Sequence, residues 1–186
     1  RLTESQGADQ EAAYRDAESA VLAELEALAG SAGDVAVQLD LAAEFDAIAA
    51  ALAGSAPAAP WFAGDAAPTS VVAGAVALVV RIAEAVPAGT ALGFGFRQRA
   101  TSTDLTPSTL VASALTGALA RRIDWIHLPA LSEERAEDAP LAAIVLRADT
   151  TLVLGVLEPG ITAATVERRL AALADAVAVA GARPLA

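Results

Sequence analysis

The sequence predicts an α/β fold built on a parallel sheet. Segments with strand-like patterns alternate with segments of helical periodicity along the chain, which is the pattern of parallel α/β architectures. The predicted strands are rich in Val, Leu and Ala, as is typical of strands that are covered on both faces. The chain has 186 residues, 55% of them hydrophobic, and a mean hydropathy of +0.51. This size and composition predict one domain, residues 1–186, with a single core.

The individual elements follow from residue spacing and from residues that start or stop helices. Thr69 or Ser70 is predicted to cap the helix at residues 71–86. Thr106 is predicted to cap the next helix, with Pro107 as its first residue, and Thr162 is predicted to cap the helix at residues 163–177. Helices are predicted at residues 10–29, 41–54, 71–86, 107–120 and 163–177, and strands at residues 35–40, 90–96, 124–130, 151–157 and 177–183.

Composition excludes several classes of function. The chain has 23 acidic and 12 basic residues and a net charge of -11, so nucleic acid and anionic membranes should be repelled. It has no Cys and a single His, which leaves too few ligands for a zinc site; we predict no metal and no other cofactor. The apolar run at residues 71–80 is too short to span a bilayer, and no signal-peptide pattern is visible. We expect a soluble, cytoplasmic protein.

Two layouts fit the pattern, an open doubly wound sheet and a closed barrel. The first strand-to-helix turn reads QLDLAAEF, without the Gly-rich loop of dinucleotide-binding folds. In a barrel, chemistry takes place at the carboxyl ends of the strands. The residues at those ends are Asp40, Arg97, His127, Glu158 and Arg183.

Several segments together carry a family resemblance. VAVQLDLAAEF, LGFGFRQ, IDWIHLPAL, APLAAIVL, TLVLGVLEPGITAATVERRLAAL and VAVAGAR resemble, in order and spacing, the second half of barrels in the cobalamin-independent methionine synthase and uroporphyrinogen decarboxylase superfamily. The resemblance covers residue 35 to the end and is closest to an actinobacterial branch. It implies a TIM (β/α)8-type barrel, present here as a partial barrel of about five parallel strands. It also implies an ancestral zinc-dependent methyltransferase-like or decarboxylase chemistry, so that an enzyme of this type would be a transferase or lyase.

The zinc ligands of that family are missing from this chain. Where the methionine synthases present a His and a Cys two residues apart, this sequence has Gly95 and Arg97. The last strand has Ala180 and Gly181 near the position of a further Cys, and His127 stands near the position of a Glu ligand. One imidazole cannot hold a catalytic zinc, which takes three protein ligands. The resemblance therefore implies a zinc-independent relative.

The stretch ALGFGFRQRA places an arginine at the end of a buried strand. Because side chains alternate along a strand, the large residues at 92, 94 and 96 should pack against helices, and Gly93, Gly95 and Arg97 should face the barrel interior. The two glycines would then leave space beneath Arg97. We expect Arg97 to bind a carboxylate or phosphate, with Arg183 as a second contact and with Gly95 and Trp125 lining the site. Alternatively, Arg97 pairs with an acidic residue in a structural network.

Three residues are candidates for proton transfer. His127 can act as a general base, or it is a half-buried residue bonded to backbone. Asp40 can handle protons, hold a divalent cation together with Glu44, or complement the amino end of a helix. Glu158 stands at a strand end, where it is an acid or base or a solvated loop residue.

Two functions are compatible with these residues. The first is a zinc-independent, methionine-synthase-like barrel protein that acts on or binds a small anionic organic molecule at the carboxyl ends of the strands. The second is a non-catalytic, degenerate relative that serves as a binding or assembly subunit. Because 186 residues are fewer than a complete barrel needs, we expect either that an amino-terminal portion was removed or that an open sheet edge is covered. The cover would be a second copy, in a homo-oligomer, or a partner chain.

Overall fold

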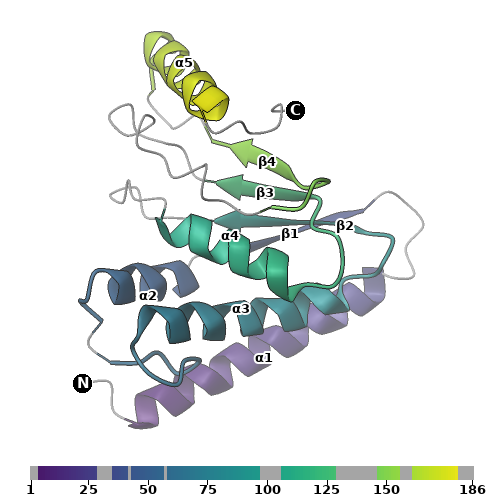
Figure 1. The fold of residues 1–186 in the computed structure, drawn as a ribbon. Coiled ribbons are helices and arrows are strands. Elements are labelled where there is room, and N and C mark those ends of the chain that lie inside the picture. The colour runs from purple at the N-terminus through teal and green to yellow at the C-terminus, as the bar shows by residue number, and fades with distance from the viewer. Residues whose placement is uncertain are drawn as a thin grey trace.

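A computed structural model describes residues 4–28, 35–41, 43–56, 58–96, 106–128, 146–155 and 161–179. Helices and strands alternate along most of this length (Figure 1). The elements, in chain order, are α1 (Glu4–Leu28), β1 (Ala36–Leu41), α2 (Ala43–Leu52), α3 (Pro68–Ala85), β2 (Ala91–Phe96), α4 (Thr106–Ala118), β3 (Trp125–Leu128), β4 (Thr151–Leu154) and α5 (Ala163–Val179).

The four strands form one parallel sheet whose spatial order, β1-β2-β3-β4, is also their order in the chain. The predicted α/β class with a parallel sheet is therefore confirmed. The register places Gly93 of β2 beside Gln38 of β1 and Trp125 of β3. Two residues further on, Gly95 lies beside Asp40 and His127.

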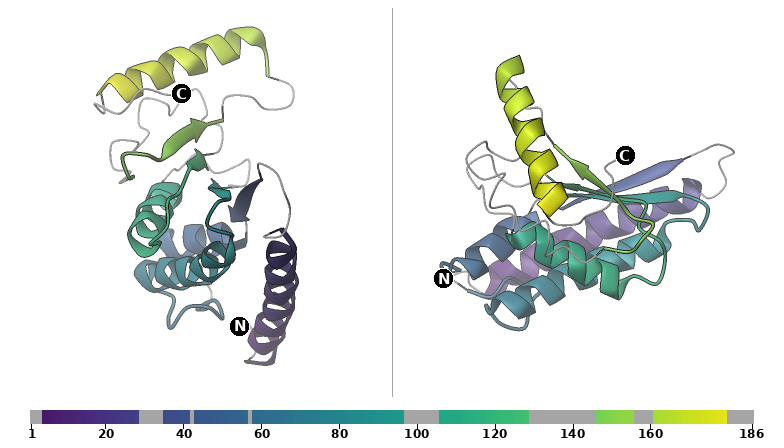
Figure 2. Two further views of the ribbon diagram at one scale, coloured as in Figure 1. Left: turned by 90° about the vertical axis from the view of Figure 1, so that its right-hand side faces the viewer. Right: turned by 45° about the horizontal axis from the view of Figure 1, so that its top comes forward.

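The two faces of the sheet differ in their cover. Helices α2, α3 and α4 lie on one side of it, α1 runs alongside α3, and α5 lies beyond β4 (Figures 1 and 2). The strand residues under the helices are apolar and buried, as predicted for β2; they include Leu41, Leu92, Phe94, Phe96, Ile126 and Leu128, none more than 2% exposed. The opposite face, called here the polar face, consists of Gln38, Asp40, Gly93, Gly95, Trp125, His127, Thr151 and Val153.

Helix α3 forms the centre of the helical layer. It begins at Pro68, with Ala67 at the N-cap, so the prediction of Thr69 or Ser70 as the cap is wrong. Proline has the backbone angle of a first helical residue, and the Asp65 carboxylate accepts the Ala67 N–H at 2.9 Å. By length and composition α3 is the one described helix apolar enough to cross a membrane. Six of its 18 residues are buried, and five of these, Val71, Ala75, Val76, Val79 and Ala83, belong to the hydrophobic core.

The carboxyl-terminal part departs from the prediction. Thr162 caps α5 as expected, because its Oγ1 accepts the backbone N–H of Thr165 at 3.3 Å. The predicted last strand, residues 177–183, is wrong over residues 177–179, which continue α5 to Val179. Ala and Leu dominate the preceding turns and are strong helix formers, so helix propagation prevails over the short alternation of Val and Ala. Residues 180–183 lie outside the described part of the chain.

Candidate functional site

Asp40 and His127 flank one glycine at the carboxyl end of the sheet. Both pair in register with Gly95 of β2 and project from the polar face. Neighbouring strands lie about 4.8 Å apart, so two strand spacings separate the backbones that carry the carboxylate and the imidazole. Asp40 is exposed and His127 is half-buried. The arrangement gives solvent access to a carboxylate and an imidazole from the same side of the sheet.

A chain of hydrogen bonds crosses the three strands on this face. The Trp125 indole Nε1–H donates to Gln38 Oε1 at 2.9 Å. Gln38 Nε2 in turn donates to Asp40 Oδ1 at 2.8 Å. The indole starts on β3 and reaches β1, so it passes over β2 between them. The three side chains thus form a continuous network, called here the Trp–Gln–Asp network.

The two glycines of β2 make this crossing possible. A Cβ atom added at Gly93 would lie 1.9 Å from Cε2 of the Trp125 indole, and one at Gly95 would lie 2.2 Å from Asp40 Oδ1. As predicted, these glycines lie opposite the apolar face of the strand. The expected space above them is absent, because side chains from the neighbouring strands occupy it. Glycine is needed here for close approach, and the neighbour that approaches is not visible in a local pattern.

The structure places part of the predicted site. Asp40, Gly95, Trp125 and His127 lie together on the polar face, whereas Arg97, Glu158 and Arg183 lie outside the described residues, and their roles stay predictions. Gln38 was missed; its spacing of two from Asp40 in a strand, which puts both on one face, was the available signal.

The alternative of a cation held by Asp40 and Glu44 gains no support. Among the described residues no group of three or more His, Asp or Glu has the arrangement of a metal site. The charge of Glu44 acts instead on Tyr14 of α1. Burial, and then the charges of Glu44 and Glu18, raise the pKa of Tyr14 to about 12.

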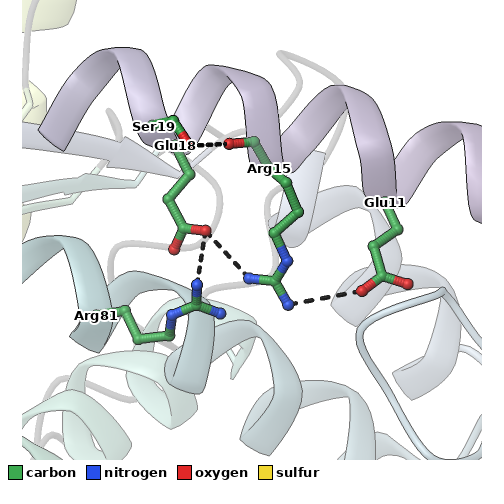
Figure 3. Close-up of polar contacts among 5 residues, drawn as sticks. All are labelled: Glu11, Arg15, Glu18, Ser19 and Arg81. Carbon is green, nitrogen blue, oxygen red and sulfur yellow. Dashed lines mark hydrogen bonds and ion pairs between the residues drawn. The ribbon is translucent and has the colours of Figure 1, made fainter. Parts of the chain in front are cut away.

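A second polar cluster joins α1 to α3 (Figure 3). The Glu18 side chain is 4% exposed. Its Oε2 accepts hydrogen bonds from Arg15 Nη1 at 3.1 Å and from Arg81 Nη2 at 2.8 Å. Its Oε1 is buried without a hydrogen-bond partner. The Arg15 guanidinium also lies 5.8 Å from the centre of the Trp61 ring, which packs 5.1 Å from that of Tyr14. This cluster fixes α1 on the helical layer, away from the polar face.

A cleft of about 660 Å³ opens at the opposite end of the sheet, where β2 and β3 begin. Its principal polar wall is Arg121, which donates to the carbonyls of Thr90 at 2.7 Å, Ala83 at 3.4 Å and Val86. Arg147 makes the same kind of contact further along the chain, with the carbonyls of Thr116 in the last turn of α4 and of Leu119 and Arg121 after it. Both arginines satisfy the last carbonyls of a helix. Among the residues lining the cleft, Arg121 is therefore bonded to backbone, Asp124 accepts the Leu92 N–H at 2.8 Å, and Arg122 pairs with Asp124 at 2.9 Å. We assign this end a structural role.

Comparison of the chain with known protein families, with curated proteins and with solved structures gives no match.

Proposed function

We propose that the chain is part of a TIM (β/α)8-type barrel of the methionine synthase-like kind, with the polar face on the barrel interior. Two observations support this. The strands are parallel and follow one another in space as they do in the chain, whereas doubly wound sheets reverse direction at a switch point. Helices α2, α3 and α4 cover one face only (Figure 2), as the outer helices of a barrel do.

The proposed function is to bind or act on a small anionic organic molecule at the carboxyl ends of the strands. The observation that carries it is the row Asp40–Gly95–His127, in which a carboxylate held by Gln38 faces the same side as an imidazole. Asp40 and His127 would hold and transfer protons at the bound molecule. Arg97 and Arg183 would bind its negative charge, and Glu158 would supply a second carboxylate. If the protein is an enzyme, a transferase or lyase reaction suits such a site.

Zinc does not fit this set of residues. The chain offers a single His and no Cys, and Gly95 stands where the resembling family has a zinc ligand. A catalytic zinc site takes three protein ligands. No step of the proposed function therefore passes through a metal.

The test is isothermal titration calorimetry against small carboxylates and phosphates, with and without added zinc. Wild-type protein should bind one of these anions saturably and to the same extent in both conditions. Arg97→Ala should abolish binding, whereas Arg122→Ala, a change at the opposite end of the sheet, should preserve it. Absence of binding to every anion, or binding that Arg97→Ala leaves intact, would contradict the proposal.

One observation favours the second candidate function, a non-catalytic binding or assembly subunit. The space above Gly93 and Gly95 is filled by protein side chains, which reduces the room for a ligand at that level. In this function a second copy or a partner chain would cover an outer strand, because β1 and β4 each pair with one described strand. A sedimentation mass equal to one chain would count against a homo-oligomer.

For either function we propose a cytoplasmic location, without nucleic acid or membrane as partner.

A further inference from the structure

We propose that Trp125 and Gln38 are positioning residues that fix the direction of the Asp40 carboxylate, and that Gly93 and Gly95 are required for this arrangement. The inference rests on the proposed function only in giving Asp40 a role at the site. The arrangement itself is argued from the hydrogen bonds and contacts of the polar face.

The network has a defined direction. An indole N–H can donate a hydrogen bond but cannot accept one. The Gln38 oxygen must therefore face Trp125, and the amide NH2 group must face Asp40, in agreement with the distances of 2.9 and 2.8 Å. Trp125 thus determines that Gln38 presents a donor, and not an acceptor, to the carboxylate.

The reach of the network requires a residue of particular size and shape. Trp125 and Gln38 lie on strands that do not touch, separated by β2 and by about 10 Å of backbone spacing. The indole spans this gap because Gly93 has no side chain beneath it; Cε2, Nε1 and Cδ2 of the ring all lie within 2.3 Å of where a Cβ would be. Phe is too short in this direction and has no donor. The hydrogen bond to Gln38 therefore requires an indole at position 125 and a residue without a side chain at position 93.

The carboxylate is directed toward the middle strand as a result. Asp40 Oδ1 accepts the hydrogen bond from Gln38 Nε2 and lies over Gly95, next to the strand that contains His127. Asp40 and Gln38 are both exposed, and exposed side chains of this kind otherwise sample several rotamers. Holding the carboxylate in one direction reduces the reorganisation that binding or proton transfer would require.

The competing interpretation is a structural bridge that only joins β1 to β3. A bridge needs the bond between Trp125 and Gln38 but no communication with Asp40. A positioning network predicts such communication, because consecutive hydrogen bonds polarise one another. The indole N–H of Trp125 should then report the protonation state of Asp40, two bonds away.

The experiment is ¹H–¹⁵N NMR of the indole groups during an acid titration of the whole chain. The protein has two Trp residues, so two indole signals are expected, and Trp61→Phe assigns them. The Trp61 signal, from a residue that packs against Tyr14 and Phe62, is the internal control for global changes. The Trp125 signal should shift when the Asp40 carboxylate is protonated. Asp40→Asn and Gln38→Met should each remove that pH-dependent shift.

A further variant separates displacement of the carboxylate from loss of the fold. In Gly95→Ala the three atoms nearest the new Cβ belong to the Asp40 and Gln38 side chains, whose ends can move, so the protein should fold while the Trp125 shift changes in size. The proposal is overturned if the Trp125 signal does not titrate, or if it titrates equally in the folded Asp40→Asn variant. No ligand is used, so failure of anion binding would leave this result interpretable.

Discussion

Replacing Gly93 by Ala tests the central contact of the polar face. The added Cβ would lie 1.9 Å from the Trp125 ring, whereas carbon atoms in contact lie about 3.5–4.0 Å apart. The indole, a rigid group, would have to move by about 1.6–2.1 Å and would lose its bond to Gln38. Overpacking of this kind costs about 1–3 kcal/mol, and the hydrogen bond adds about 1 kcal/mol. We expect the free energy of unfolding to fall by about 2–4 kcal/mol.

Urea denaturation measures this loss, and Gly117→Ala is the matched control. Gly117 lies in helix α4, and a Cβ there meets nothing within 4 Å, so alanine should stabilise the protein by about 0.5–1 kcal/mol. A Gly93→Ala protein as stable as wild type, with unchanged Trp125 fluorescence in a Trp61→Phe background, would refute the position of the indole over Gly93.

Three further predictions concern residues outside the polar face. Arg121→Met should lower the free energy of unfolding by about 2–4 kcal/mol, because three carbonyls lose a charged donor. The control Arg122→Met changes a side chain that is 59% exposed and should lower it by about 0–1 kcal/mol. Equal losses in urea denaturation would contradict the assigned capping role of Arg121. Arg81→Met should destabilise the protein more than Glu18→Met does. Arg81→Met leaves the Glu18 carboxylate, which is 4% exposed, with one partner, whereas Glu18→Met leaves behind the Arg81 side chain, which is 51% exposed and solvated by water. The reverse order in thermal unfolding would disprove this asymmetry. Burial and the nearby acidic charges raise the pKa of Tyr14 to about 12, so the contribution of protonated Tyr14 to the free energy of unfolding should be complete below about pH 10 and lost as the pH rises toward 12. Urea denaturation across that range should show a loss of stability that Tyr14→Phe lacks. Tyrosinate absorbance reports this residue alone, because the chain has one Tyr.

Local patterns were sufficient for the parallel sheet and for most of the helices. The alternation in β2 correctly assigned Phe94 to the covered face and Gly95 to the polar face, because burial on one side imposes a period of two. The start of α3 and the end of α5 were predicted less well. Pro68 and an Ala-rich sequence extend these helices beyond the limits that polar caps and Val alternation indicated.

The candidate site was predictable in its residues but not in its geometry. Asp40 and His127 could be named because polar groups at the carboxyl ends of strands are exceptional in so apolar a chain. That an indole fills the space over Gly93 depends on a side chain 32 positions further along the chain. Such a contact arises only when β2 and β3 pair, and no single segment encodes it.

The two backbone-binding arginines couple neighbouring units of the chain. Arg121 precedes β3 and Arg147 precedes β4, yet each binds carbonyls where an earlier helix ends, α3 and α4 respectively. Each helix is thus completed by a residue that is synthesised after it. A nascent chain that stops after α4 would leave the end of α3 without its guanidinium, and successive units should gain hydrogen-exchange protection in steps that lag one unit behind synthesis.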